Sequence, residues 1–334
     1  MDEFPAKQYS LVDPIVYNLE NISNNISDVV SIEHRKEKVA CPKGSISRLS
    51  DIVVNPNGSL LDSSGIPIEE SIQDFLGQMS AKESSPRSPS EESGIVLFKY
   101  GYNNYGHWLI EMLPKLHWLK NTIDRHPDSK ILIGNVSGAV RDITYSTLEH
   151  FGISGNSLLP IKQSTQFEEL FYCSPITMHP FMMRPEIREF YRELAQSVKT
   201  PQDKIFVTRP PGATRTIKRL NLIEDFFSKL GYRIIEPAGL PFLEQVEIFK
   251  NSREVVGIAG AAMTNAVFCA AGTKILHLVP PSMPNLFFYQ LASICDHEYS
   301  EFRGKSDNGD MFGKQFDIDL AELGNIIEQQ YASI

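Results

Sequence analysis

The 334-residue sequence lacks several features that mark whole classes of protein. Its four cysteines form no C-x-x-C pair, so neither a zinc knuckle nor a disulfide framework is indicated, and we expect free, mostly buried thiols. No segment approaches the ~20 apolar residues of a membrane span, and the first residues show no basic stretch leading into an apolar one. We therefore expect a cytoplasmic protein without a transmembrane segment.

The sequence also lacks an excess of positive charge. Its 32 basic and 41 acidic side chains give a formal net charge of -9, which argues against nucleic acid or an anionic membrane as the main partner. Any anion that binds must therefore meet a local basic cluster. The length suffices for two compact domains, and two domains imply a cleft.

Composition and turn residues divide the chain into four regions. Residues 1–94 show short alternating runs and turns typical of strands and hairpins, and form a lead-in to the N-terminal domain. Within them, the polar, proline-broken stretch 83–93 predicts a mobile loop. An α/β pattern then predicts a Rossmann-like domain over residues 95–199 and a second over 200–300, followed by a C-terminal tail with a helix over 301–334.

Strands alternate with helices in both predicted domains. Such alternation requires right-handed crossovers and a parallel sheet covered on both faces. In the first domain we expect strands at 95–100 and 130–133, helices at 107–120 and 139–151, and a connecting helix at 185–198. In the second we expect strands at 204–208, 232–235, 254–258 and 274–279, with helices near 221–230, 241–250 and 263–271.

Two loops of the second domain suit a phosphate group. Residues 255–265 run from a buried strand through Gly257 and Gly260 into a helix, whose start attracts anions through its N–H groups. The basic loop 208–219 follows a strand of the same sheet, so both loops are expected at one crevice beyond the carboxyl ends of the strands. Together they predict a diphosphate site. The alternatives are tight strand-to-helix packing without a ligand and a solvated basic face.

The glycine turn does not fit a nicotinamide cofactor. The third glycine of the dinucleotide fingerprint and the acidic residue ~20 positions further on are missing where they are expected. A nicotinamide-dependent enzyme is therefore disfavoured.

A third segment, residues 102–116, places chemistry in the first domain. His107 and Glu111 are four residues apart and therefore share one face of the predicted helix. Pro114 should kink or restart that helix and free the carbonyl of Ile110. The segment predicts an imidazole and an acid near the helix start, with an exposed i,i+4 pair as the alternative.

These segments resemble glycosyltransferase family 61. Residues 104–114, NYGHWLIEMLP, are similar to the family's N-Y-x-H-W-L-x-(E/D)-x-L-P signature. A Thr-Arg pair after a strand, the stretch PFLEQ at 241–245 and the glycine turn with Thr264 and Asn265 are similar to its nucleotide-binding half. The resemblance covers roughly residues 95–280, with its motifs in the same order.

The resemblance implies an α/β protein of the GT-B type, with two facing Rossmann-like domains. It implies an inverting hexosyl- or pentosyltransferase that needs no metal and uses a nucleotide-sugar donor, commonly UDP-linked. The acceptor would be an oligosaccharide or lipid-linked glycan of bacterial capsule or other surface polysaccharide, which allows peripheral membrane association. Ala259, where the family often has histidine, and Pro210, in place of a second arginine, depart from the pattern and shift phosphate contact toward Arg215, Lys218 or Arg219.

Roles for individual residues follow from these patterns. Glu111 is the predicted general base, and His107 orients it or substitutes for it. The predicted nucleotide site comprises Arg209, Arg215, Lys218, Gly260, Ala261, Thr264 and Asn265, and the predicted acceptor site comprises Asn104, Tyr105 and His179. The string Asp317-Ile318-Asp319 has the form of a metal-binding D-x-D motif, but Asp319 followed by Glu322 reads better as a capping box.

Two other functions use the same features. One is a glycan-binding or scaffold protein that kept the fold but lost activity, in which Ala259 and Pro210 would be substitutions that accompanied the loss. The absence of donor hydrolysis would identify such a protein. An enzyme that modifies nucleotide sugars, such as an epimerase, would use the crevice without an acceptor. An added glycan would leave its activity unchanged.

Overall fold

The computed structural model describes residues 2–73, 88–196, 200–210, 212–306 and 315–331. The chain divides into two compact units, Met1–Tyr9 with Val39–Tyr191, and Ser10–Lys38 with Arg192–Ile334. Both are mixtures of helices and parallel strands, as the α/β prediction requires. Residues 10–38, expected in the N-terminal lead-in, belong to the second unit, because strand β3 (Ile15–Tyr17) pairs with strand β17 (Glu298–Arg303).

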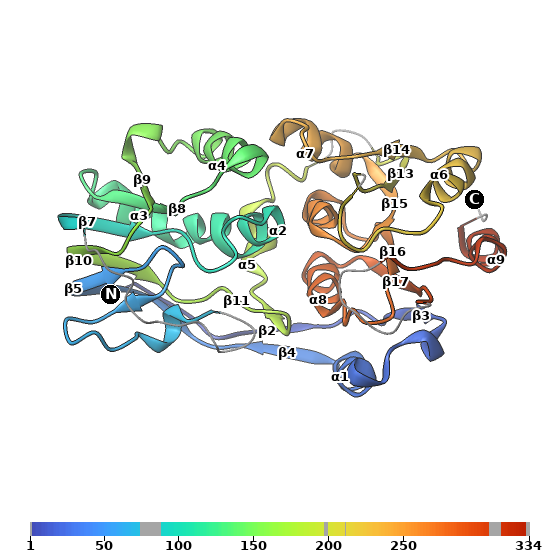
Figure 1. Cartoon of the computed structure of the whole chain (residues 1–334), viewed down its shortest axis with the longest axis horizontal. Coiled ribbons are helices and arrows are strands. Elements are labelled where there is room, and N and C mark those ends of the chain that lie inside the picture. Colours follow the sequence, from blue (N-terminus) through green and yellow to red (C-terminus); the bar gives the residue numbers. More distant parts are fainter. Residues whose placement is uncertain (1, 74–87, 197–199, 211, 307–314, 332–334) are drawn as a thin grey trace. The chain divides into compact units, whose positions relative to one another are not determined.

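The sheet of the first unit combines parallel and antiparallel strands (Figure 1). Strands β7, β8, β9 and β10 are parallel, whereas β5 runs antiparallel to β10 and carries β1 and the short β6. The order is β1 (Asp2–Phe4), β5 (Gly44–Val54), β10 (Thr165–Cys173), β7 (Ser88–Val96), β8 (Lys130–Gly134) and β9 (Leu158–Ile161), with β6 (Leu60–Leu61) beside β5.

Part of the expected mobile loop 83–93 is a strand. Residues 83–87 lie outside the described residues, but residues 88–93 belong to β7, where Ser88 pairs with Thr165 and Ser93 with Glu169. The prediction of a loop is wrong for these residues. Backbone hydrogen bonds to β10 hold a polar sequence that could not order itself by burying side chains.

Helices connect the strands of the first unit in the predicted places, with two differences. The expected helix 107–120 is a succession of α2 (Tyr105–His107), the π-helix η3 (Trp108–Met112), the 3₁₀ turn η4 (Leu113–Lys115) and α3 (Leu116–Arg125). Helix α4 (Gly138–His150) matches expectation. The predicted helix 185–198 is wrong for residues 191–196, which follow α5 (Glu186–Phe190), because Tyr191 turns into the core and its hydroxyl donates to the carbonyl of Leu109. Residues 197 and 198 lie outside the described residues.

The second unit has a fully parallel sheet, as predicted (Figure 1). Its strands in order are β14 (Arg233–Ile235), β13 (Asp203–Val207), β15 (Ser252–Ile258), β16 (Lys274–Val279), β17 and β3. The connections between successive strands from β13 to β17 contain α6 (Leu220–Lys229), α7 (Phe242–Lys250), the 3₁₀ helix η6 (Ala261–Phe268) and α8 (Leu286–Cys295). Apolar side chains of β13, β15 and β16 pack with those of α6, including Phe206, Val256, Leu276 and Phe227, and their removal from water stabilises this unit.

The end of the described chain completes the second unit. Helix α9 (Leu320–Tyr331) begins after Asp319, whose Oδ1 accepts hydrogen bonds from the N–H groups of Ala321 at 3.0 Å and Glu322 at 3.1 Å. Asp319 is therefore the N-cap of α9, which agrees with the interpretation of the D-x-D string as a cap rather than a metal motif. The neighbouring Asp317 forms an ion pair with Arg219.

The remaining described elements are short or lie at the margins of the two units. They are β2 (Lys7–Ser10), η1 (Leu19–Asn21), α1 (Asn24–His34), β4 (Lys38–Cys41), η2 (Glu69–Ser71), η5 (Gly155–Ser157), β11 (Thr177–Met178) and β12 (Met182–Met183). The four cysteines are free and buried, as predicted. Among the described helices, none is both long and apolar enough to cross a membrane.

Candidate active site

The sheet of the first unit reverses its direction of growth at β7. The chain passes from β7 to β8 on one side, whereas β10 pairs with β7 on the other side, with Tyr172 opposite Val96. In open α/β sheets, ligands bind beyond the carboxyl ends of strands at such a switch point. Lys99 follows β7 here, and His179 follows β10 through the short strand β11.

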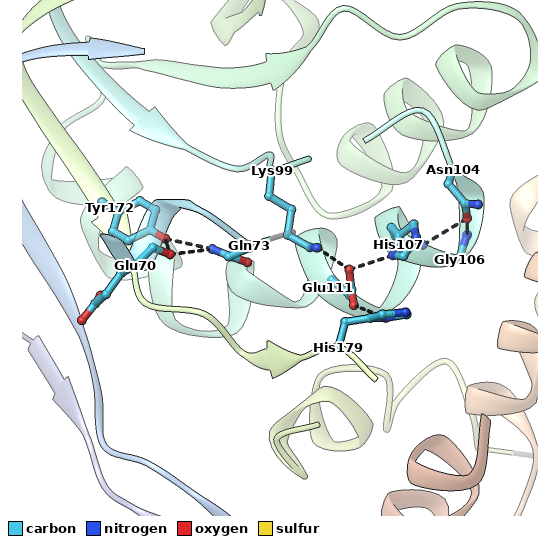
Figure 2. Close-up of polar contacts among 9 residues, drawn as sticks. All are labelled: Glu70, Gln73, Lys99, Asn104, Gly106, His107, Glu111, Tyr172 and His179. Atoms are coloured by element: carbon cyan, nitrogen blue, oxygen red, sulfur yellow. Dashed lines mark hydrogen bonds and ion pairs between the residues drawn. The ribbon is translucent and has the colours of Figure 1, made fainter. Parts of the chain in front are cut away.

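Glu111 is the centre of a polar cluster at this edge (Figure 2). Its Oε2 lies 2.7 Å from Nζ of Lys99 and 2.8 Å from Nδ1 of His107, and its Oε1 lies 3.1 Å from Nδ1 of His179. The Glu111 side chain is 0% exposed, whereas those of His107 and His179 are 27% and 31% exposed. The predicted proximity of His107 and Glu111 is confirmed, and His179 joins them.

The local helix geometry places these side chains. Asn104 caps the helix, since its Oδ1 accepts from the N–H groups of Gly106 at 2.8 Å and His107 at 3.4 Å. The expected disturbance before Pro114 takes the form of the π-helix, and Tyr191 satisfies the carbonyl of Leu109 at 2.6 Å. π-Helical turns are frequent at functional sites. In this helix, the side chain of Asn104 serves as the N-terminal cap.

A tight turn packs against the backbone of Lys99. Gly58 has a φ of +90°, and a Cβ atom there would lie 2.7 Å from the Cα of Lys99. Only glycine permits this approach without a shift of the main chain. The turn that ends β5 therefore packs directly against the segment that follows β7.

The electrostatics of the cluster keep Glu111 ionised. Burial raises the pKa of this carboxyl, but the charge of Lys99 and the hydrogen bonds from His107 and His179 together hold it well below its usual range. An ionised carboxylate accepts the Nδ1–H of an imidazole, which assigns the other ring nitrogen, Nε2, to accept a proton. The arrangement thus supplies carboxylate-oriented imidazoles at a partly exposed site.

The same cluster contains the atoms of a metal site. One donor atom each from His107, Glu111 and His179 lies within 4.8 Å of the others. The ammonium group of Lys99 already pairs with Glu111 Oε2, however, and would stand beside any cation bound there. This positive neighbour opposes a divalent ion.

A second candidate site lies at the switch point of the second unit. The chain passes from β13 to β14 on one side and returns to β15 on the other side of β13. Arg209 follows β13, and its Nη1 donates to the carbonyl of Ala259, after β15, at 3.0 Å. A Cβ atom at Gly260 would lie 2.2 Å from the same Nη1. The absence of a side chain at Gly260 therefore lets the guanidinium lie against the glycine turn.

Arg209 and Arg215 bring two positive charges into this region. Burial, and then the charge of Arg215, lower the pKa of Arg209 to about 10, and burial also lowers the pKa of Arg215. Arg215 Nη1 lies 3.3 Å from Sδ of Met283. A bound anion would offset both the burial and the mutual repulsion of these guanidinium groups.

Comparison with known proteins shows the family of the chain. The family model described as Glycosyltransferase 61 matches residues 105–276, just over half of the chain. The match begins at the helix that carries His107 and Glu111, and it ends within β16. This chain belongs to glycosyltransferase family 61. No curated protein matches it.

The transferase therefore acts on a sugar donor and a glycan acceptor. Thr264 and Asn265 are buried, with Thr264 Oγ1 donating to the carbonyl of Ala261 at 2.6 Å and Asn265 Nδ2 donating to Gln245 Oε1 at 2.9 Å. These side chains hold the fold around the glycine turn. Ala261 is half-buried at the start of η6.

Two further predicted residues are Lys218, in the second unit, and Tyr105, in the first. Lys218 lines a cavity of about 390 Å³ together with Arg219, Lys305 and Asp317, and the lining of that cavity includes neither Arg209 nor Arg215. Tyr105 is half-buried in α2, directly after the cap residue Asn104. The structure thus brings Arg209, Arg215 and Gly260 together and places Lys218 in a different cavity.

Two buried lysines of the transferase were not predicted from the sequence. Lys99 interrupts the apolar run that begins at Ile95, and a charge within such a run was a signal that it has a buried partner. Lys115 is also fully buried, which lowers its pKa, and its Nζ lies 5.6 Å from the ring centre of Tyr172. Its position beside Pro114 gave no comparable signal.

Proposed function

We propose that this family 61 transferase moves a sugar, with inversion and without a metal ion, from a UDP-linked donor to a hydroxyl of a growing surface glycan. The proposal includes a GT-B arrangement and a cytoplasmic site of action in polysaccharide assembly. The observation that carries it is the cluster around Glu111, because a buried carboxylate that orients partly exposed imidazoles is an arrangement suited to deprotonating a hydroxyl. The nucleotide and the surface glycan follow from the family resemblance.

The geometry favours an imidazole as the base, the alternative role that the sequence left to histidine. Glu111 has no exposed side-chain surface, and its low pKa makes it a weak proton acceptor. His107 and His179 are partly exposed and receive orientation from the carboxylate. Glu111 then acts through the histidines as a positioning residue, and it stabilises the imidazolium that forms.

The donor half of the proposal rests on Arg209, Arg215 and the turn at Gly260. Guanidinium groups remain charged and bind phosphate oxygens in a forked geometry. Their place beyond β13 and β15 matches the position at which open α/β sheets bind nucleotides. Two fixed positive charges supply the neutralisation that a metal ion gives in other sugar transferases.

The chemical step is a single displacement. The acceptor oxygen forms a bond to the anomeric carbon while the bond from that carbon to the diphosphate oxygen breaks. The hydroxyl proton passes to Nε2 of the histidine, and the nucleoside diphosphate leaves with the electron pair. Attack opposite the leaving group inverts the anomeric centre.

Donor turnover tests the proposal. The full-length protein is incubated with UDP-, GDP- and CMP-sugars, and thermal shift and release of the nucleotide are measured with and without a glycan acceptor. UDP-sugars should raise the midpoint of unfolding, and release of UDP should be slow alone and faster with acceptor. Binding without release would favour an inactive relative, and an isomerised nucleotide sugar would favour an epimerase.

A further inference from the structure

A cavity of about 380 Å³ borders the Glu111 cluster. It lies within the first unit, at the carboxyl ends of β7 and β10 and beside the start of the antiparallel strand β5. Its volume is at the small end of the roughly 300–1,000 Å³ that ligand pockets span.

One wall of the cavity is fixed by hydrogen bonds (Figure 2). The buried hydroxyl of Tyr172 donates to the carbonyl of Glu70 at 2.7 Å, and Gln73 Nε2 donates to that hydroxyl at 2.9 Å. Ser174 Oγ donates to Glu70 Oε2 at 3.3 Å. These bonds attach η2 to the end of β10, so the wall that carries Glu69, Glu70 and Gln73 is held in place before a ligand arrives.

Two lining residues belong to the Glu111 cluster. Lys99 and His179 both line it, and both contact Glu111. His107 contacts the same carboxylate but is not among the lining residues. A hydroxyl group held in this cavity would lie beside the side chain of His179.

The charges of the lining select among sugars. Lys99 is already paired with Glu111, which leaves Lys43 against the two carboxylates of Glu69 and Glu70. The remaining balance is negative, so it repels carboxylate and phosphate groups. The carboxylates can accept bonds from sugar hydroxyls, and the half-exposed Met178 offers an apolar surface to the C–H face of a ring.

From these observations we propose that the cavity is the acceptor subsite, that it takes an uncharged sugar unit, and that His179 is the base that faces it. This inference rests on the proposed function, which it deepens by naming the class of acceptor. A uronic acid or phosphorylated sugar would bring its anion against Glu69 and Glu70.

Saturation-transfer NMR on the full-length protein tests the subsite. The probes are methyl β-glucopyranoside, methyl β-galactopyranoside and methyl β-glucuronopyranoside. The neutral glycosides should receive saturation and the glucuronide little. Met178→Trp, which fills the cavity from its rim, should abolish the signal, whereas the matched control Ile66→Trp adds the same side chain at an exposed position outside the lining and should preserve it.

A second variant tests the charge argument. Glu69→Gln removes one exposed carboxylate without changing shape, and should improve glucuronide binding relative to glucoside by about two- to fivefold. Equal saturation in wild type and Met178→Trp, no saturation of the neutral glycosides, or a preference for the glucuronide would each overturn the proposal. Glycoside binding as expected with no turnover of any nucleotide sugar would instead remove the transferase mechanism and leave a sugar-binding cavity.

Discussion

Glu111 Oε2 lies 2.7 Å from Nζ of Lys99, and the two side chains are only 0% and 4% exposed. Opposite charges buried together are stable only as a pair, because removal of one leaves the other desolvated and unpaired. The same carboxylate also orients His107 and His179. Glu111 therefore couples the stability of the first unit to the proposed chemistry.

Glu111→Gln should consequently impair both properties. The amide leaves the ammonium group of Lys99 buried without its counter-charge, which should lower the free energy of unfolding by about 3–5 kcal/mol. It also removes the negative charge that orients the imidazoles, so kcat should fall by about 10²–10⁴. Urea denaturation and steady-state transfer assays measure the two effects.

Two further variants separate these effects. Lys99→Met combined with Glu111→Gln should recover much of the stability but none of the activity. Glu247→Gln is the matched control, because its carboxylate pairs with Lys250 at the surface and is 62% exposed. A Glu111→Gln protein as stable as the control would contradict the buried-pair argument.

Sequence alone could predict much of the second unit and one contact of the site. Apolar runs between residues 204 and 279 match β13–β16 closely, because strands buried on both faces need apolar residues at nearly every position. The i,i+4 relation of His107 and Glu111 is local, and helix geometry alone brings them together.

The remaining contacts depend on pairing between distant strands. His179 is 68 residues from Glu111 in sequence and reaches it only because β10 lies beside β7. Residues 10–38 join the second unit because Tyr17 pairs with Phe302. No spacing rule contains this information, so local patterns could give neither the contact of His179 with Glu111 nor the place of residues 10–38 in the second unit.

Gly260→Ala should weaken nucleotide binding without removing a charge. The new methyl group would lie 2.2 Å from Arg209 Nη1 and must displace the guanidinium. Loss of that phosphate contact should cost about tenfold to a hundredfold in UDP affinity, similar to Arg209→Ala, because hydrogen bonds to charged groups contribute about 1.5–3 kcal/mol. Isothermal titration calorimetry measures the affinities.

The matched control for Gly260→Ala is Gly155→Ala. A Cβ atom at Gly155 meets no atom within 4 Å, so this change in the first unit should leave UDP affinity unaltered. Unchanged affinity in both Gly260→Ala and Arg209→Ala would remove the proposed phosphate site.

His277 should make the protein less stable in mild acid. It is buried in β16, where its ring lies against those of Phe288 and Tyr299. Burial lowers its pKa to about 4; the charge of Glu301 opposes this shift, and the charge of Arg303 adds to it. The unfolded chain binds this proton near pH 6.5, so between about pH 6.5 and 4 the unfolded state binds more protons. The free energy of unfolding should fall in that window by up to about 1.4 kcal/mol per pH unit.

Urea denaturation from pH 7 to 4 measures this slope. His277→Leu removes this titrating group and should reduce the slope in that window. The same substitution at the exposed His117 is the control. An equal slope in wild type and His277→Leu would assign the acid sensitivity to another group.

Turnover should not depend on a divalent ion. His107, Glu111 and His179 could hold one, but Lys99 places a positive charge on the same carboxylate, and Arg209 and Arg215 neutralise the diphosphate in the proposal. Dialysis against EDTA should leave kcat unchanged. Activity lost with chelator and restored by Mn²⁺ or Mg²⁺ would contradict metal independence and direct attention to the Glu111 cluster.

The product should have the anomeric configuration opposite to that of the donor, and His179 should be the more sensitive of the two histidines. His179 lines the acceptor cavity and His107 does not, although both contact Glu111. His179→Ala should therefore lower kcat by about 10²–10⁴, with donor affinity nearly intact, and His107→Ala should lower it less. NMR of the product gives the configuration, and steady-state kinetics give the comparison.

Because the His179 side chain is 31% exposed, free imidazole should enter the site of His179→Ala and restore part of the rate, which it would not do for a residue that only supports the fold. Retention of configuration would refute the single displacement. Inversion with a greater loss in His107→Ala, and no rescue of His179→Ala by imidazole, would move the base to His107.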